Sequence, residues 1–213
     1  FLQPYYTNYF YFEFYHEFEK LTLNSALFYS NATDQILNVL EKTGNQTSDG
    51  FDIFRRIPIN NGVLNQTGFE LEATYNPNNK IRLYGLFSPY LSVLTDTRDN
   101  AYDYDNWVFF TNVRFLYRIT NTLRFNVDYI FQSAQKTALT ELKDIQYVNL
   151  NISKDFWEGK STLSFKINDV FYSRKSDFSS LEANTITRRS FIFDTQYLLS
   201  FSYRFNKGSR RNS

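Results

Sequence analysis

Cysteine is absent from this sequence of 213 residues, and His16 is its single histidine. A Cys–His catalytic pair is therefore excluded, and so is a zinc site that needs a second histidine. No stretch reaches the ~18–20 unbroken apolar residues of a membrane-spanning helix, and there is neither a G-x-S-x-G motif nor a phosphate-binding glycine loop. We predict that the protein is not an enzyme and uses no cofactor. A Ser–His–Asp triad around His16 is the weaker alternative to a polar residue at a membrane interface.

Charge of either sign is not in excess, whereas aromatic residues are. With 23 Lys and Arg against 22 Asp and Glu, the net charge is +1, which argues against nucleic acid as a partner. The chain has 17 Tyr and 23 Phe, yet its mean hydropathy is only −0.46. A transmembrane β-barrel reconciles these values, because every second side chain faces lipid and the others face a wet lumen.

Apolar and polar side chains alternate in nine segments bounded by turn residues. In "LRFNVD" (123–128), for example, every second side chain is apolar. The region 51–75 is long enough for one strand or two. The predicted strands contain residues 7–18, 20–30, 68–75, 81–87, 107–118, 123–131, 147–154, 163–169 and 191–205.

The connections between these strands alternate in length. Short turns fall at 17–20, 76–80, 119–122 and 157–160, and long polar links fall at 33–50, 95–106, 133–143 and 173–187. Outer-membrane barrels have short periplasmic turns and longer outer loops. A soluble β-sandwich has the same period, but its packing would bury the charges that recur along one face of these strands. The sequence thus predicts an all-β, antiparallel transmembrane barrel.

The strand predicted at 191–205 is too long for a small barrel. Its 15 residues span roughly 50 Å, more than the ~25 Å apolar band needs even at ~40° of tilt. An odd strand number and an open sheet edge are also unfavourable in lipid. We therefore expect residues 1–205 to be the C-terminal part of a larger, 22-stranded barrel. Residues 206–213 are expected to form a periplasmic tail.

Three stretches carry a family resemblance. The first has a "P-x-x-T-x-x-x-x-x-E" pattern followed by "LFY…D-I" (Pro4 to Ile36), the second is "GFELEATYNP" (Gly68 to Pro77), and the third is "LLSFSYRF" (198–205). Their order and spacing resemble those of TonB-dependent outer-membrane transporters of the Bacteroidota type. One departure is that eight residues follow Phe205, whereas many relatives end on the terminal aromatic residue.

This resemblance implies an outer-membrane location in a Gram-negative bacterium and the uptake of a scarce solute such as a glycan or a siderophore. It also implies lipid as a partner, a plug domain that lies outside this chain, contact with the TonB complex through the missing N-terminal part, and an assembly signal at Tyr203 and Phe205. A structural barrel that docks a surface lipoprotein or an assembly or secretion complex is the alternative. A small complete channel and a hydrolase rank lower.

The lumen face holds the candidate site residues, whose charges would contact a plug domain or a substrate. The plainer interpretation is ion pairing that seats the plug. A loop rich in aspartate is a solvated loop or, as the alternative, a Ca²⁺ site formed by Asp96, Asp99, Asp103 and Asp105. The lumen-facing candidates are Glu70, Glu72, Arg114, Arg118, Arg124, Asp128, Lys166, Asp194 and Arg204.

Overall fold

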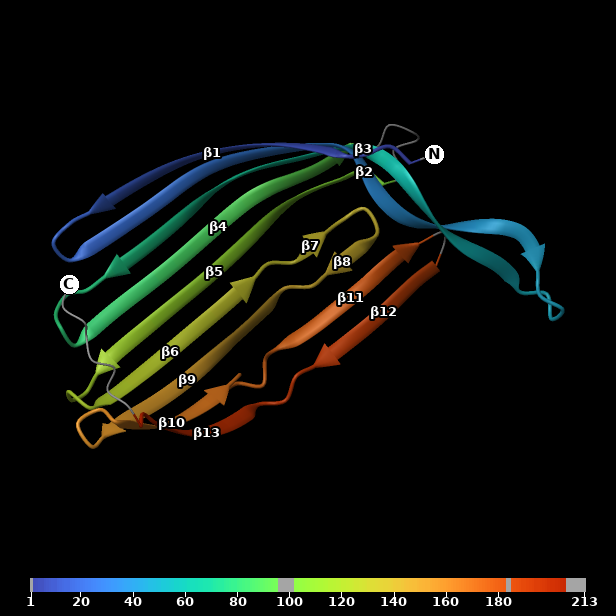
Figure 1. The fold of residues 1–213 in the computed structure, drawn as a ribbon. Coiled ribbons are helices and arrows are strands. Elements are labelled where there is room, and N and C mark those ends of the chain that lie inside the picture. The colour runs from blue at the N-terminus through green and yellow to red at the C-terminus, as the bar shows by residue number, and fades with distance from the viewer. Residues whose placement is uncertain (1, 96–101, 183–184, 206–213) are drawn as a thin grey trace.

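Antiparallel β-strands form all of the regular secondary structure that the computed structural model describes, in residues 2–95, 102–182 and 185–205 (Figure 1). No helix among them is long and apolar enough to cross a membrane. The strands are β1 (Tyr6–Glu17), β2 (Leu21–Gln46), β3 (Asp52–Tyr75), β4 (Ile81–Thr95), β5 (Tyr104–Arg118), β6 (Leu123–Gln132), β7 (Gln135–Lys136), β8 (Thr140–Leu142), β9 (Ile145–Phe156), β10 (Ser161–Asn168), β11 (Lys175–Glu182), β12 (Thr185–Ile192) and β13 (Gln196–Tyr203).

The main sheet has nine strands in the order β1-β2-β3-β4-β5-β6-β9-β10-β13, which confirms the predicted all-β class and the number of alternating segments. Its strands pair antiparallel with their neighbours, and the sheet curves into a trough (Figure 1). The edge strands β1 and β13 each pair on one side only in the described part of the chain. The soluble sandwich is therefore wrong, since none of the described strands forms a second layer packed face to face on the trough.

A second sheet of four strands, in the order β12-β11-β8-β7, continues the last four strands of the main sheet. The prediction of one continuous strand at 191–205 is wrong, because β12 ends at Ile192 and β13 begins at Gln196. The predicted long links at 133–143 and 173–187 are likewise partly strand. Residues 96–101, within the predicted link at 95–106, lie outside the described residues, and so does the predicted tail 206–213.

Asp169 holds the break between β10 and β11 in place. It has a positive φ of 55° and is only 2% exposed. Its carboxylate accepts hydrogen bonds from the backbone N–H groups of Ser173 (2.9 Å) and Arg174 (2.8 Å), and its carbonyl accepts one from the Thr195 hydroxyl (2.7 Å). The carboxylate thus replaces ladder partners that the chain loses where it turns out of the sheet.

The β2–β3 hairpin extends well beyond the other strands (Figure 1). Its strands have 26 and 24 residues, so the region 51–75 forms one strand, and most of the predicted link 33–50 is strand too. Ion pairs of 2.6 Å between Lys42 and Asp52 and between Arg55 and Glu41 join its two arms. Hydrogen bonds, first that from Lys42, hold the pKa of Asp52 below its ordinary value.

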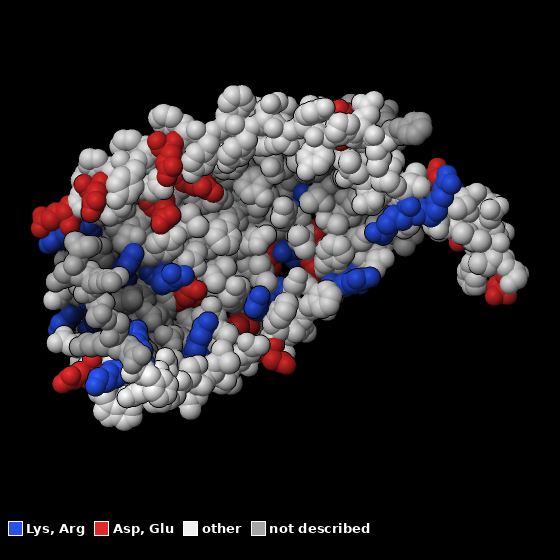
Figure 2. Space-filling view, viewed as in Figure 1, with Lys and Arg blue, Asp and Glu red and all other residues white. Residues whose placement is uncertain are grey.

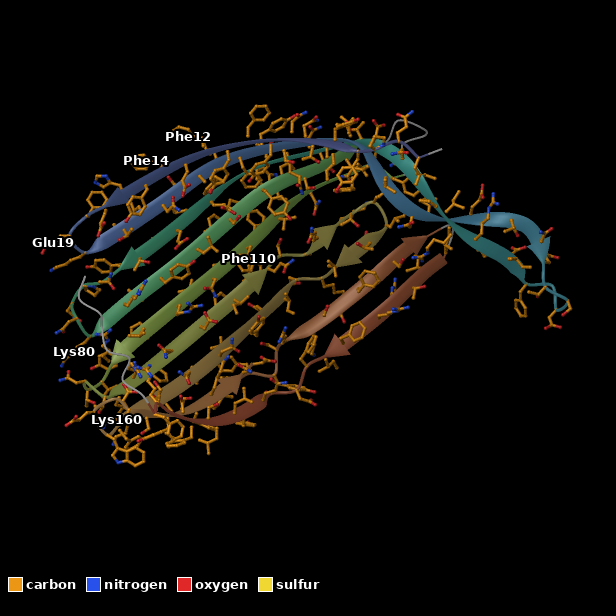
Figure 3. All side chains as sticks on the ribbon, in the orientation of Figure 1. Phe12, Phe14, Glu19, Lys80, Phe110 and Lys160 are labelled. Atoms are coloured by element: carbon orange, nitrogen blue, oxygen red, sulfur yellow. The ribbon has the colours of Figure 1, made fainter. Side chains whose placement is uncertain are left out.

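The outer, convex face of the trough is apolar and exposed. Phe12 is 69% exposed, and Figure 3 shows it with Phe14 on the outer side of the curve. A band of this kind matches the thickness of lipid. On β5, Trp107 and Tyr117 lie ten residues apart on this face, a strand length of ~33 Å that spans ~25 Å at a tilt of about 40°.

A row of aromatic side chains crosses the concave face beside Gly68. A Cβ atom on Gly68 would lie 2.5 Å from the Pro89 carbonyl oxygen, 2.5 Å from Tyr90 Cβ and 2.7 Å from Phe28 Cζ. We expect Gly68→Ala to lower the free energy of unfolding by about 1–3 kcal/mol, the usual effect of overpacking. The urea midpoint of the folded, heat-modifiable band on gels measures this change.

Gly85→Ala is the matched control, because a Cβ atom on Gly85 of β4 would meet nothing within 4 Å. That substitution should leave the midpoint unchanged or raise it, since alanine restricts the unfolded chain. Equal midpoints for the two variants would show that Gly68 does not serve close packing.

Candidate functional site on the concave face

The cross-strand register places most of the charged candidates on the concave face, opposite the exposed phenylalanines. Arg114 lies directly opposite Asp128, and Arg118 lies opposite Arg124. Two candidates lie outside the strands: Asp194 is in the break between β12 and β13, and Arg204 follows β13, where its N–H donates to the Lys160 carbonyl (2.8 Å). The trough in Figure 2 accordingly shows charged side chains inside its hollow.

Acidic and basic side chains are separated on this face (Figure 2). Carboxylates gather over β1–β3, where Glu13 accepts a hydrogen bond from Asn24 Nδ2 (2.7 Å) and Glu70 accepts one from Ser88 (3.3 Å). Glu72 lies two residues further along β3. Most of the basic side chains on this face belong to the strands that follow, together with Asp128 and Asp155, which pair with two of them. Such a distribution creates a field across the hollow that orients a charged solute or domain.

Two ion pairs cross the basic half. Arg114 Nε lies 3.4 Å from Asp128 Oδ1. Arg124 Nη2 lies 2.7 Å from Asp155 Oδ1, which also accepts a hydrogen bond from the Thr162 hydroxyl (2.7 Å). The second pair is the more buried, with side-chain exposures of 37% and 20% against 55% and 24%. It is also the shorter pair, and solvent screens it less than the first.

A basic cavity of about 320 Å³ lies at the end of the trough that has the short turns. Figure 3 places Lys80 at that end together with Glu19 and Lys160. Of the two arginines in its lining, only Arg124 has an ion-pair partner among the described residues. The lining residues are Asn79, Lys80, Arg118, Thr120, Asn121 and Arg124.

A second polar cavity, of about 250 Å³, lies where the last strands break. It brings together two of the sequence candidates, Lys166 and Asp194. Sequence reasoning missed three of its other residues, Asp169, Arg174 and Phe193, because they lie in breaks between strands, where alternation assigns no inward position. The lining residues are Tyr147, Asn149, Lys166, Asn168, Asp169, Arg174, Phe193, Asp194 and Gln196.

Arg174 is the central cation of this cavity. Its Cζ atom lies 4.9 Å from the ring centre of Tyr147 and 4.5 Å from that of Phe193. Its Nε atom is buried and has no hydrogen-bond partner. Within the predicted strand 191–205, strict alternation would place Phe193 in lipid or in an aromatic girdle. That placement is wrong, because the break at 193–195 interrupts the alternation and turns this ring towards Arg174.

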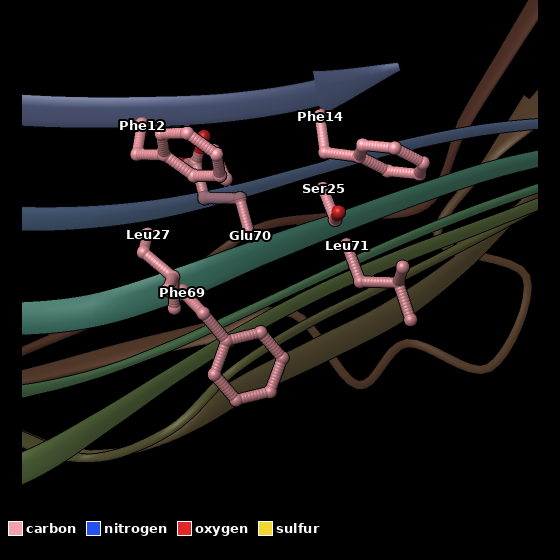
Figure 4. Close-up of a pocket in the computed structure, with 8 residues that line it drawn as sticks. Phe12, Phe14, Ser25, Leu27, Phe69, Glu70 and Leu71 are labelled. Carbon is pink, nitrogen blue, oxygen red and sulfur yellow. The ribbon is translucent and has the colours of Figure 1, made fainter. Parts of the chain in front are cut away.

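The convex face has an apolar cleft of about 200 Å³, shown in Figure 4. Ser25 is a small residue between Phe12, Phe14 and Leu71, so the surface is hollowed there. A lining of this kind suits a hydrocarbon chain. The remaining lining residues are Ala26, Leu27, Phe69 and Glu70.

The proposed Ca²⁺ ligands and His16 are not brought together into a site by the described residues. Asp96 and Asp99 lie outside the described residues, and the described part of the chain holds no group of three potential metal ligands around Asp103 and Asp105. His16 packs on the convex face, with ring centres 6.2 Å from Phe14 and 4.3 Å from Phe18.

The ring of Tyr203, half of the predicted assembly signal, lies 4.9 Å from that of Phe205 and 5.9 Å from that of Trp157. This aromatic cluster lies beside the short turn between β9 and β10, where the Arg204 N–H donates to the Lys160 carbonyl. Such a position is typical of the aromatic girdles of outer-membrane barrels. Whether the assembly machinery reads these two residues stays a prediction.

The curved antiparallel sheet, the apolar exterior and the charged interior define a transmembrane β-barrel protein. The sequence profile of the outer membrane protein beta-barrel family matches residues 1–203. The chain belongs to this family and is located in the outer membrane. Searches of curated proteins and of solved structures found no match.

Arg124→Gln should lower the free energy of unfolding by about 1–3 kcal/mol, because it leaves the half-buried carboxylate of Asp155 without its cation. Arg118→Gln is the matched control on the opposite strand. It should leave stability unchanged or raise it slightly, since two arginines directly opposite one another repel. Urea midpoints of the two variants test this order, and a larger loss for Arg118→Gln would contradict the assigned pairing.

Proposed function

We propose that this chain forms part of the wall of a TonB-dependent transport barrel that takes up a scarce solute in a bacterium of the Bacteroidota. The observation that carries the proposal is the concave face, which combines polar cavities with cations, among them Lys166 and Arg174, that form no ion pair with any described residue. A structural wall would favour charges that neutralise one another. The resemblance of three stretches of the sequence to this class of transporter adds support.

The edges of the sheet support a barrel larger than nine strands. A strand edge in hydrocarbon leaves backbone N–H and C=O groups without partners, at several kcal/mol for each group. We propose that further strands pair with β1 and β13 and close the barrel. A plug domain inside it would contact the separated acidic and basic halves of the concave face, and the TonB complex would act on that domain.

Outer-membrane lipid is the proposed partner of the convex face. The exposed phenylalanines cover this face between the aromatic ends of the strands, and the cleft around Ser25 accommodates an acyl chain. Catalysis is not part of the proposal, because the polar cavities are lined by amides and ion-forming groups rather than by a nucleophile and its base.

A structural subunit is the second candidate function, favoured by the β2–β3 hairpin. This hairpin projects beyond the rest of the sheet and carries exposed apolar residues, among them Phe51 (70%) and Phe54 (40%). Such an arm suits the docking of a surface lipoprotein or of an assembly or secretion complex.

Deletion of the gene in its own bacterium tests the transport proposal. We expect the deletion strain to lose growth on at least one limiting carbon or iron source, and a strain without TonB to lose growth on the same source, because uptake depends on both proteins. Growth curves on single-source media measure the effect. The control is the deletion strain complemented with the wild-type gene.

A structural subunit would give a different result. Growth defects would then be the same on every source and would not follow the loss of TonB. That outcome would contradict transport.

A further inference from the structure

We infer that the cavity at the strand break binds the carboxylate of a small, hydroxyl-rich solute, such as a sugar acid, through Arg174 and Lys166. A guanidinium has five N–H donors. The guanidinium of Arg174 lies over the rings of Tyr147 and Phe193, which attract its charge but accept no ordinary hydrogen bond. Its buried Nε without a partner is a rare condition that an acceptor in the cavity would relieve.

The carboxylates of the cavity do not meet this need. Asp169 is committed to its own turn, where it accepts from two backbone N–H groups and the Ser173 hydroxyl. Asp194 accepts a hydrogen bond of 3.4 Å from the Tyr172 hydroxyl. Neither Arg174 nor Lys166 forms an ion pair within the part of the chain that the structure describes. Two cations are thus left facing one small space.

The rest of the lining selects hydroxyl groups. Asn149 uses its oxygen to accept from the Asp169 N–H (3.0 Å), and Asn168 donates to the side-chain oxygen of Gln196 (3.3 Å). Among the described residues, no partner is found for the amide nitrogens of Asn149 and Gln196 or the amide oxygen of Asn168, and the Asp194 carboxylate has acceptor capacity beyond its bond from Tyr172. These groups hydrogen-bond hydroxyls in both directions.

The size of the cavity fits the same class of ligand. Its volume of about 250 Å³ lies below the range of ~300–1,000 Å³ typical of drug-sized ligands, so it suits one sugar ring or a small hydroxy acid. The planar fork of Arg174 pairs with a carboxylate through two parallel hydrogen bonds, which a neutral sugar cannot offer. The inference rests on the proposed function in one respect only, namely that the bound solute is the one that the barrel transports.

Calorimetry on the full protein in detergent tests the inference, with D-glucuronate and D-glucose as probes. The two differ in the carboxylate alone. We expect glucuronate to bind the wild-type protein, and glucose to bind roughly tenfold more weakly or not at all. Arg174→Gln should weaken glucuronate binding by about tenfold or more. Arg189→Gln is the matched control, because Arg189 is exposed on β12. It should leave glucuronate binding unchanged.

The inference would be overturned by no binding of glucuronate to the wild-type protein, by equal binding of glucose, or by unchanged binding to Arg174→Gln. Acetate that competes as well as glucuronate would also overturn it, since hydroxyl contacts would then contribute nothing. If Arg174→Gln gives no heat-modifiable folded band, Lys166→Gln takes its place with the same expected loss. Binding that persists while the growth test fails would refute transport and leave this site standing.

Discussion

The backbone hydrogen bonds of the sheet are the constraint on which the rest of the structure depends. In hydrocarbon a strand can satisfy its N–H and C=O groups only with its neighbours, so each strand is fixed in register between two others. Fixed register forces alternate side chains to opposite faces. Phenylalanine on one face and arginine or glutamate on the other are therefore consequences of one ladder, as the direct pairs Phe115–Val127 and Arg114–Asp128 on β5 and β6 illustrate.

The same ladder explains where binding groups gather. Within the apolar band, charges on the concave face sit at regular strand positions and can pair across strands, as Arg124 does with Asp155. Beyond the apolar band, side chains no longer need to alternate strictly between apolar and polar. The turn held by Asp169 then brings Phe193 and Arg174 into one cavity with Lys166. The irregular backbone thus forms the cavity around Arg174, and the regular strands of the main sheet hold that cavity in place.

The fold was largely predictable from the sequence, because the alternation of apolar and polar side chains is a local signal that recurs in each strand of the main sheet. The break at 193–195 was not, since it depends on hydrogen bonds that Asp169 makes to residues up to 26 positions away. The links at 33–50 and 173–187 read as loops because strands outside lipid have the polar composition of loops. Lys166 and Asp194 were predicted as lumen-facing, whereas Arg174 was missed because it follows a strand end and belongs to no alternating segment.

Spin labelling along β5 tests the central claim most directly, and the absence of cysteine makes single-cysteine variants specific. Labels at Phe109→Cys, Val113→Cys and Phe115→Cys should collide mainly with oxygen dissolved in lipid. Labels at Phe110→Cys, Asn112→Cys and Leu116→Cys should collide mainly with a water-soluble nickel reagent. The ratio of the two collision rates should therefore alternate with a period of two residues in reconstituted membranes. A ratio without alternation, or with the opposite phase, would contradict the assignment of the apolar face to lipid.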